Sequence, residues 1–466
     1  MSAIDITVAS RGHIVAPAGC GKTHLLTEAL MTGSDRPRLV LTHTTAGVAA
    51  MKARLRKLNV PSKNYVVATI DGWALRFAKF FPNTCEFDFE DAPAPQFYPR
   101  LRAAVTAALS SEIFDEIVSA SYSQLLVDEY QDCNDEQHRL ICQLSRVIPS
   151  VVFGDPMQAI FTFSGRMPSW DREVGEAFPL IATLDTPWRW SLAENEELGT
   201  WILDNRTSLQ EGRGLILDTT PACVQVIRLQ DNSKYNDTAK ADVIYGLMRE
   251  HPTESIMAIA GPRDLRGRQE FGRRVRGLDV LDSVELTDAI NAAQRIDRMT
   301  PENALKTVLE GLSKFVTNLE TTATCQRVTT ILSGTNRNPP TEFESISASF
   351  SIHPNRRNLY QLILAAERKP GTRVFRRAPF ETLKEAASLG ASEPTLSLVS
   401  IAKSVRDSWR HKGDSRISYR TVGSTLLLKG LECDHAVILN ARDPDMTPQH
   451  LYVAISRASK SLTIFT

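Results

Sequence analysis

Residues 14–23 read IVAPAGCGKT, a short apolar stretch that runs directly into a glycine-containing turn. The turn matches the phosphate-binding loop pattern A-x-x-x-x-G-K-T, with Ala16 in place of the usual first glycine. Gly19 and Gly21 allow the backbone to curl so that successive N–H groups face phosphates at a helix N-terminus. Apolar residues then continue at helical spacing, which predicts a strand over 14–16, a loop, and a helix containing Leu25, Leu26, Ala29 and Leu30.

The side chains of this loop match the chemistry of a nucleoside triphosphate. Lys22 would neutralise the β- and γ-phosphates, and Thr23 would ligate Mg²⁺. The alternative interpretation is a glycine-rich turn that binds no ligand. The strand before the turn and the GKT ending favour a nucleotide-binding loop instead. The predicted nucleotide-binding loop comprises Ala16, Pro17, Ala18, Gly19, Cys20, Gly21, Lys22, Thr23 and His24.

A second chemical signal follows at 125–132, which read LLVDEYQD. Three apolar residues predict a buried parallel strand, and the acids fall at its carboxyl end, where ligands sit in open α/β sheets. Asp128 there can hold Mg²⁺, and Glu129 can orient and deprotonate the attacking water. Without other motifs, two acids after an apolar strand more often simply face solvent at the end of that strand than take part in catalysis. The upstream phosphate-binding loop favours the catalytic interpretation.

DEYQD resembles motif II of the UvrD/Rep group of superfamily 1 DNA helicases. Other blocks resemble the remaining motifs of that group in the expected order: LTHTTAGVAAMKARL (41–55), TIDGWALRF (69–77), VVFGDPMQAIFTFSG (151–165), TPWRW (186–190), GSTLLLKGLECDHAVIL (423–439) and LYVAISRASKSL (451–462). The resemblance implies an α/β fold with two RecA-like P-loop NTPase domains, each with a mainly helical insertion. ATP is then the substrate and Mg²⁺ the cofactor.

The same resemblance assigns roles to residues outside the loop. Arg189 and Arg457 would act as arginine fingers on the γ-phosphate. Gln158 matches the glutamine that links ATP to the DNA track, and Trp188 matches the aromatic that stacks on adenine. Glu432 matches a position near the ribose or the γ-phosphate, with a helix-start carboxylate as the alternative.

Single-stranded DNA would lie over aromatic and hydroxyl side chains of the motifs. Phe161 and Phe163 occupy places where bases stack, although their alternate spacing also fits a core strand. The other predicted DNA-binding residues are Thr42, His43, Thr44 and Thr69. These threonine hydroxyls could donate to phosphates, but they could equally cap helices.

Four positions depart from the family pattern. The glutamine that usually reads adenine would fall near the first methionine and is missing, which leaves strict ATP preference open. Ser424 and Leu426 replace a threonine and a histidine, so a DNA contact is in doubt. His43 stands where an aromatic residue usually stacks on a base.

The motif positions divide the chain into four predicted parts, in the 1A/1B/2A/2B arrangement. The first RecA-like domain takes 1–77 and 120–175, and the second takes 176–290 and 392–466. The insertions are 78–119 in the first domain and 291–391 in the second, and both are short for the family. The second insertion should be helical, with buried stripes that include Leu305, Val308, Leu309, Leu312, Phe315, Leu359, Leu362, Ile363 and Ala366.

Composition places the chain among globular proteins. Of its 466 residues 42% are hydrophobic, and 54 basic residues balance 54 acidic ones, so its net charge favours no particular partner. No apolar run suits a membrane span, and no leader is evident, so we expect a cytoplasmic protein. Its seven cysteines contain no C-x-x-C pair, which disfavours a zinc ribbon and a disulfide framework. The stretch 353–377 has seven basic residues and one acid, and fits a duplex- or partner-facing surface or solvated helix ends equally.

Three functions compete on these observations. The first is an ATP-dependent translocase or helicase acting 3′→5′ on single-stranded DNA. The second is a DNA-end-sensing ATPase that controls a partner nuclease without processive unwinding, which the short insertions favour. The third is an inactive scaffold, against which the full set of motif residues speaks. The size and the GSTLLLKGLE segment are also similar to the helicase subunits of Gabija anti-phage systems, whose partner is a nuclease of the ATPase–TOPRIM type.

Overall fold

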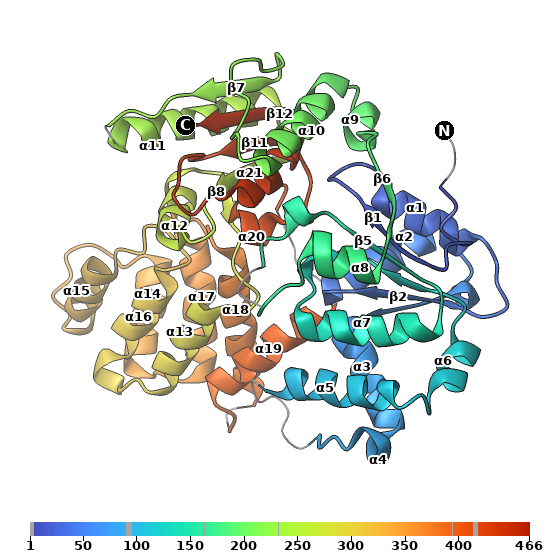
Figure 1. The fold of residues 1–466 in the computed structure, drawn as a ribbon. Coiled ribbons are helices and arrows are strands. Elements are labelled where there is room, and N and C mark those ends of the chain that lie inside the picture. Colours follow the sequence, from blue (N-terminus) through green and yellow to red (C-terminus); the bar gives the residue numbers. More distant parts are fainter. Residues whose placement is uncertain (1–3, 90–95, 162–164, 232, 394, 413–417) are drawn as a thin grey trace. The chain divides into compact units, whose positions relative to one another are not determined.

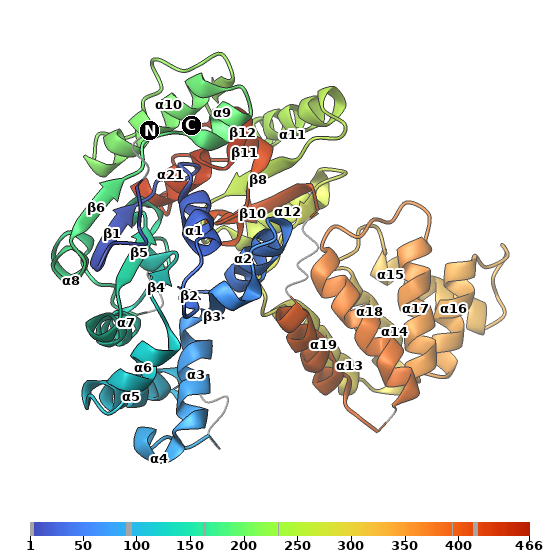
Figure 2. The same cartoon turned by 90° about the vertical axis from the view of Figure 1, so that its right-hand side faces the viewer.

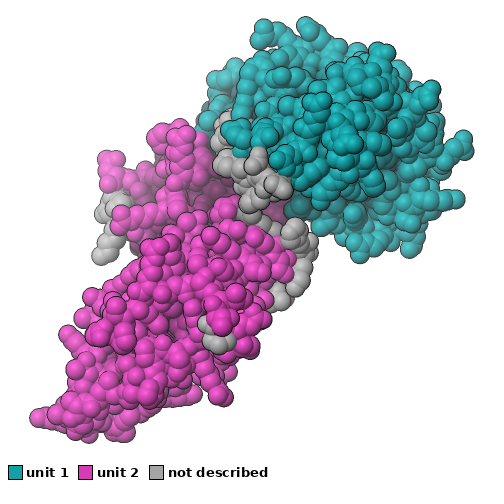
Figure 3. Space-filling model, turned by 90° about the horizontal axis from the view of Figure 1, so that it is seen from below, with its two compact units in different colours: residues 1–226, 446–463 teal, residues 227–445, 464–466 magenta. Residues whose placement is uncertain are grey.

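The computed structural model describes residues 4–89, 96–161, 165–231, 233–393, 395–412 and 418–466. These residues form two compact units, coloured separately in Figure 3. Unit 1 contains 1–226 and 446–463, and unit 2 contains 227–445 and 464–466. None of the helices in the described ranges combines the length and the hydropathy needed to cross a membrane.

Unit 1 is built on a six-stranded sheet with the order β3-β2-β4-β5-β1-β6. Every described pairing in it is parallel. Such a sheet needs cover on both faces, which fits the nearly continuous apolar strands of the sequence. The strands are β1 (Arg11–Val15), β2 (Arg38–Thr42), β3 (Tyr65–Thr69), β4 (Leu125–Val127), β5 (Ser150–Gly154) and β6 (Leu180–Thr183).

Helices cover the two faces of this sheet (Figures 1 and 2). Helices α1 (Lys22–Met31) and α2 (Thr45–Lys57) pack on the face that carries Val40. Helices α3 (Ile70–Phe80), α5 (Phe97–Ser110) and α7 (Asp135–Val147) pack on the face that carries Leu39 and Leu41. Successive strand residues point to opposite faces, so both cores come from the same apolar run.

The segment 78–119, expected as an insertion, belongs to the core of unit 1. It contains α4 (Pro82–Cys85), α5 and part of α6 (Asp115–Ser121). Leu101 and Val105 of α5 are fully buried, in the same hydrophobic cluster as Leu41 and Leu144. The segment therefore adds cover to the sheet of unit 1.

The boundary of the first unit lies later in the chain than the predicted domain boundary at 175. Strand β6 pairs in parallel with β1, so residues 180–183 extend the first sheet. The elements that follow β6 in unit 1 are α9 (Trp188–Leu192) and α10 (Glu196–Gln210). Helix α21 (Pro448–Ile455) also belongs to this unit, although the sequence assigned it to the second domain. The division between the units falls within β7 (Val224–Ile227) and β12 (Ala458–Phe465).

Unit 2 contains a second parallel sheet. The four of its strands that lie wholly within unit 2 have the order β11-β8-β10-β9, and the described pairings among them are parallel. Helices α11 (Ser233–Glu250) and α12 (Leu265–Arg274) contribute to the hydrophobic cluster around it. These strands are β8 (Ile256–Ala260), β9 (Asp279–Val280), β10 (Arg420–Ser424) and β11 (Cys433–Ile438). The short helix α20 (Thr425–Leu428) directly follows β10.

A helical bundle completes unit 2 (Figure 2). The predicted stripe residues from Leu305 to Phe315 and from Leu359 to Ala366 are buried in its core, which confirms them as packing faces. The bundle extends beyond the predicted 291–391 on both sides. Its helices are α13 (Thr287–Asp297), α14 (Ala304–Leu312), α15 (Thr321–Leu332), α16 (Glu342–Ile352), α17 (Arg356–Arg368), α18 (Arg377–Ser392) and α19 (Leu398–Lys412).

The basic stretch 353–377 is not a uniform solvent-facing surface. Arg376 is only 4% exposed and its guanidinium donates to Asp282 at 3.1 Å and to Asp288 at 2.8 Å. The guanidinium of Arg373 donates to three backbone carbonyls, among them that of Gly272 at 2.8 Å. Much of the positive charge therefore holds unit 2 together, which the sequence interpretation missed because the partners lie far along the chain.

Candidate nucleotide- and DNA-binding site

The predicted motifs of unit 1 gather at one edge of its sheet. The phosphate-binding loop follows β1, Thr42 ends β2, Thr69 ends β3, and Asp128 follows β4. Gln158 follows β5 in the same way. Because the strands are parallel, all five carboxyl ends lie at the same edge, which is where open α/β sheets bind ligands.

The loop after β1 has the backbone geometry of a phosphate cradle. Gly19 and Gly21 have φ values of 73° and 89°, in the left-handed region that favours glycine. A Cβ at Gly19 would lie 2.8 Å from the ring of Trp190, and one at Gly21 would lie 3.0 Å from the ring of Trp188. Both glycines are therefore required by backbone conformation and by close packing. Helix α1 begins at Lys22, directly after the loop.

Lys22, Asp128 and Glu129 come together across the sheet edge. Lys22 Nζ lies 3.0 Å from Asp128 Oδ1 and is also bonded to Glu129 Oε1. The three side chains are partly or largely shielded from solvent. The structure thus brings the loop lysine together with the two acids that follow β4.

The backbone at Glu129 helps to aim these carboxylates. Glu129 has a φ of 55°, which is unusual for a residue with a side chain. Its N–H donates to Asp128 Oδ1 at 2.9 Å, and its own Oε2 accepts from Gln131 Nε2 at 2.5 Å. Strained backbone of this kind persists where surrounding contacts fix it, and it is common at functional sites.

Electrostatics couple the lysine to the acids. Burial alone would lower the pKa of Lys22, but the carboxylates of Asp128 and Glu129 outweigh burial and raise that pKa, so Lys22 stays charged. Burial raises the pKa of Asp128, and the charge of Lys22 opposes that rise. Burial also raises the pKa of the Cys20 thiol to about 12, which makes it an unreactive thiol within the loop.

Gln158 belongs to a second polar group beside the first. Its Nε2 donates to Asp155 Oδ2 at 3.1 Å, and Arg206 Nη2 donates to Asp155 Oδ1 at 2.7 Å. Asp155 N–H in turn donates to Gln131 Oε1 at 3.1 Å. Gln131 therefore bridges the acids after β4 and the loop after β5.

The two predicted arginine fingers meet at one turn after α21. The guanidinium of Arg189 donates to the backbone carbonyl of Ser456. Arg457 is 2% exposed, and it donates to the carbonyl of Val453 at 2.8 Å and to Ser456 Oγ at 2.7 Å. In this structure both guanidinium groups are thus held by the turn at Ser456.

The loop also contacts α9 and α21 directly. Arg189 N–H donates to Gly19 O at 3.1 Å, and Ala18 N–H donates to the hydroxyl of Tyr452 at 2.9 Å. Tyr452 is fully buried, and burial raises the pKa of its hydroxyl well above the usual value. Trp188, at the start of α9, is 38% exposed, so its side chain is partly accessible to solvent.

Two residues that contact the site, Tyr452 and Arg206, were given no role by the sequence analysis. Tyr452 lies within the LYVAISRA motif, so its position five residues before Arg457 was a usable signal. Arg206 lies on α10 outside every motif, and no pattern in the chain distinguishes it from a surface arginine.

Other predicted nucleotide-binding residues are less involved. The side chain of His24 is 67% exposed, and its described partner is Glu28 of the same helix at 3.5 Å. Glu432 is exposed and directly precedes β11 in unit 2, so it is not the helix-start carboxylate of the alternative interpretation. Thr23 lies in the first turn of α1.

The predicted DNA-binding residues divide into stacking and capping groups. His43 and Phe161 stack, with ring centroids 6.5 Å apart and planes 16° from parallel. Phe161 lies outside any strand, which removes the core-strand alternative for it, and Phe163 lies outside the described residues. Thr44 and Thr69 cap helices by accepting from the N–H groups of residues 47 and 72, as the capping alternative predicted. Thr42 is buried.

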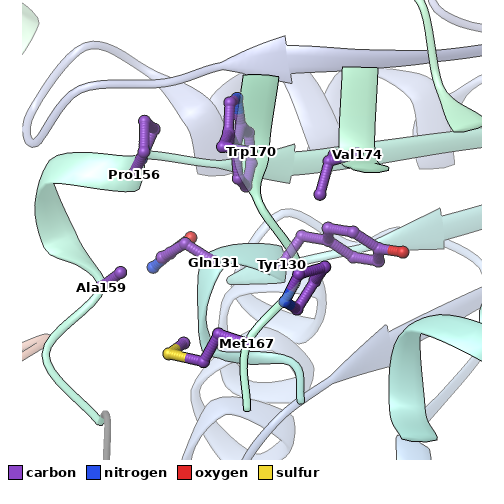
Figure 4. A pocket seen from close by; sticks show the side chains of 8 residues that line it. Tyr130, Gln131, Pro156, Ala159, Met167, Trp170 and Val174 are labelled. Atoms are coloured by element: carbon purple, nitrogen blue, oxygen red, sulfur yellow. The ribbon is translucent and has the colours of Figure 1, made fainter. Parts of the chain in front are cut away.

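A small cavity lies beneath these loops (Figure 4). Its volume is about 160 Å³, and Tyr130, Gln131 and Trp170 are among its lining residues. A Cβ at Gly154 would lie 2.5 Å from the ring of Trp170 and 2.7 Å from Gln131 Oε1. Trp170 and Gln131 therefore pack so closely on β5 that only glycine fits, which fixes the bridge between the two polar groups.

The residues present fit a magnesium nucleotide. Mg²⁺ prefers oxygen ligands and a few protein contacts completed by water and phosphate, and Thr23 and Asp128 offer a hydroxyl and a carboxylate. Gly19 and Gly21 adopt left-handed backbone conformations, which suit a loop whose N–H groups turn towards phosphates.

Comparison with known proteins covers part of this region. Residues 97–170 match the family model of the UvrD/REP helicase N-terminal domain. A stretch of 72 residues is 32% identical to one subunit of the ATP-dependent helicase/nuclease of Leuconostoc mesenteroides subsp. mesenteroides, and it covers 16% of this chain and 6% of that relative. The chain therefore matches only a small part of that relative.

Two solved structures of the arterivirus nonstructural protein 10 helicase, one with DNA, align over the whole chain. Their identities are 9% and 10% and their TM-scores 0.35 and 0.36. This chain covers 62% and 61% of those chains. TM-scores this low do not support a conclusion about the fold. The architecture described above is therefore taken only from the sheets and helices of this protein.

Proposed function

We propose that this protein is an ATP-dependent DNA translocase or helicase of the UvrD/Rep type, moving 3′→5′ on single-stranded DNA. The observation that carries the proposal is the contact of Lys22 with Asp128 and Glu129 beside a glycine cradle. The matched UvrD/REP helicase segment at 97–170 includes both acids and Gln158. The similarity of short segments to helicases supports DNA as the partner.

Lys22 would bind the phosphates, while Thr23 and Asp128 would hold Mg²⁺. A bound magnesium ion would neutralise phosphate charge and polarise the reacting phosphoryl group. Glu129, held by Gln131, would orient the attacking water and accept its proton. Arg189 and Arg457 would then stabilise charge at the γ-phosphate, which requires them to exchange contacts at the Ser456 turn for contacts with the nucleotide.

Hydrolysis would be communicated to DNA through the hydrogen-bonded chain of Glu129, Gln131, Asp155 and Gln158. Its first member touches Lys22, and its last lies three residues before Phe161, which stacks on His43. A change at the phosphates can therefore alter the position of a base-stacking aromatic. Stacking on aromatic rings tolerates any base, which suits a motor that moves over any sequence.

A second candidate is a DNA-end-sensing ATPase that regulates a partner nuclease without processive unwinding. The observation that favours it is the segment 78–119, whose described helices pack into the core of unit 1 and so form no separate accessory domain there. The finer proposal is a motor subunit of an anti-phage defence complex of the Gabija kind, cytoplasmic, with an ATPase–TOPRIM nuclease as partner. It depends on the size of the chain and on the similarity of residues 423–432.

Domain roles follow from the same proposal. Residues 1–77 and 120–175 would supply most of the first RecA-like domain, and 176–290 with 392–466 most of the second, including Glu432 near the nucleotide. The sheet of each unit supports a RecA-like core, whereas β6, α9 and α21 belong to the first compact unit. The bundle of α13–α19 would be the second insertion.

Strand separation on tailed duplexes tests the proposal and separates the two candidates. Purified protein, ATP and Mg²⁺ should displace the labelled strand of a duplex with a 3′ single-stranded tail, and not of one with a 5′ tail. Lys22→Ala should abolish displacement, and the exposed Glu28→Gln should retain it as a matched control. ATP hydrolysis without displacement on either substrate would favour the sensing ATPase.

A further inference from the structure

Three potential metal-binding side chains of unit 2 converge outside the nucleotide site. His251 Nδ1 lies 3.2 Å from Glu254 Oε2, and His435 Nε2 lies 2.6 Å from the same oxygen. The imidazole rings of His251 and His435 are 4.1 Å apart, centroid to centroid. One donor atom from each residue lies within 4.8 Å of the others.

The backbone that presents these side chains is fixed on both sides. His251 and Glu254 lie in the turn between α11 and β8, and His435 lies on β11, in register with Ile256 of β8. His435 N–H donates to Ser255 O at 3.0 Å, and Ser255 N–H donates to Asp434 Oδ2 at 2.9 Å. The donors are therefore held together before any ligand binds.

Arg420 fixes the same turn from β10. Its Nη2 donates to the carbonyl of Pro252 at 2.7 Å and reaches the carbonyls of Met248 and His251 at 3.4 and 3.5 Å. Its positive charge would oppose a bound cation, and the carboxylate of Glu254 within the cluster offsets that charge.

We propose that His251, Glu254 and His435 form a binding site for a divalent transition-metal ion, with Zn²⁺ the best match. Two imidazole nitrogens and one carboxylate oxygen are a common zinc donor set, with bond lengths of about 2.0–2.2 Å. Donors at those lengths around a tetrahedral ion lie about 3.3 Å apart, close to the 3.2 Å between His251 and Glu254. The 2.6 Å between His435 and Glu254 is a hydrogen-bond distance, so a bound ion would have to separate these two donors by roughly 0.7 Å. Mg²⁺ and Ca²⁺ fit less well because they prefer all-oxygen sites.

The fourth coordination position would be open. The side chain of His251 is 37% exposed, that of Glu254 is 28% exposed, and that of His435 is 3% exposed. The cluster is thus anchored on a buried side and reaches solvent on the other, so water or a donor from another molecule can complete the coordination. The metal would join the α11–β8 turn to β11 and stabilise unit 2.

The competing account is a metal-free triad in which one carboxylate oxygen accepts N–H groups from both imidazoles. The two accounts differ in a measurable way. A metal site binds Zn²⁺ at one ion per chain and needs both histidines, whereas a hydrogen-bonded triad shows no stoichiometric Zn²⁺ binding.

The test uses the full chain, stripped with a chelator and titrated with ZnCl₂ against a chromophoric zinc indicator. Wild type should bind one Zn²⁺, and His251→Gln and His435→Gln should each weaken binding by more than about 100-fold, which exceeds the ~10–100-fold that loss of an outer hydrogen-bonding partner typically costs. His353→Gln is the matched control, since His353 is exposed and lies in a different segment, and it should bind as wild type does. His251→Gln keeps the test valid if replacement of the buried His435 impairs folding.

Two further measurements test whether the metal ion binds at these three residues and not at another site of the chain. Co²⁺ in place of Zn²⁺ should give the visible absorption of a low-symmetry N/O site without a thiolate charge-transfer band. Zn²⁺ should also raise the melting temperature of wild type and of His353→Gln but not of His251→Gln. Absence of stoichiometric binding, equal binding by His251→Gln, or a thiolate band would each overturn the proposal.

Discussion

Lys22 Nζ lies 3.0 Å from Asp128 Oδ1, although one residue begins the helix after β1 and the other follows β4. Strand β5 lies between these two strands in the sheet, so the contact spans the loop edge of three neighbouring strands. The lysine also binds Glu129, the proposed general base. Phosphate recognition and water activation thus share one charged group in the proposed mechanism.

Glu129→Gln should separate binding from hydrolysis. The amide keeps the size of the side chain but cannot accept the proton of the attacking water, so the turnover rate should fall by about 10²-fold or more. Nucleotide and DNA affinities, measured by fluorescence titration, should remain within a few-fold of wild type. Glu28→Gln, on the exposed side of α1, should hydrolyse ATP normally. Full turnover in Glu129→Gln would mean that another group positions the water.

Gly19→Ala should weaken nucleotide binding. An alanine at a φ of 73° is strained by about 1–2 kcal/mol, and its Cβ would lie 2.8 Å from the ring of Trp190. The nucleotide dissociation constant should rise about tenfold or more, which calorimetric titration can measure. Gly33→Ala is the control, because nothing lies within 4 Å of a Cβ there. Equal affinities of the two variants would show that the loop does not adopt this conformation when it binds nucleotide.

The Mg²⁺ requirement should depend on pH through Asp128. Burial raises the pKa of this carboxyl above its ordinary value, despite the opposing charge of Lys22. A proton therefore competes with Mg²⁺ at a higher pH than at an ordinary aspartate, and metal binding weakens as the pH falls towards that pKa. The Mg²⁺ concentration for half-maximal hydrolysis should be higher at about pH 5.5 than at about pH 8. An unchanged requirement would place the metal on other ligands.

Arg376→Met should destabilise unit 2 far more than its neighbour Arg377→Met. Arg376 is buried against Asp282 and Asp288, and removal of one partner of a buried ion pair typically costs about 3–5 kcal/mol. Arg377 is exposed and pairs with Asp279 at 3.2 Å, so its loss should cost about 1 kcal/mol or less. Denaturant unfolding measures both. Similar costs for the two variants would contradict the internal role of Arg376.

Local sequence patterns were sufficient to predict the strand, loop and helix around residue 22 and the strand before Asp128. These features depend on neighbours in the chain: glycine at left-handed positions, three apolar residues and then two acids. The helical stripes of the bundle were also predictable, because apolar residues at helical spacing need a core. The parallel strand at 125–127, with the two acids at its carboxyl end, was also predicted correctly.

Features that depend on distant partners were not predictable. Arg376 looks like part of a basic surface until Asp282 and Asp288 are placed beside it. The hydroxyl of Tyr452 meets Ala18 only after α21 joins unit 1. Likewise, His251 and Glu254 show a weak spacing signal, and His435 reaches them only through the pairing of β11 with β8.

The most direct test of the central claim is the steady-state rate of ATP hydrolysis with and without single-stranded DNA. Wild type with Mg²⁺ should be strongly stimulated by DNA. Phe161→Ala should need more DNA for the same stimulation, since loss of one stacked base costs about 1–3 kcal/mol. Phe80→Ala, at an exposed phenylalanine of α3, is the control and should respond as wild type does. A hydrolysis rate that saturating DNA leaves unchanged would contradict the proposed DNA motor.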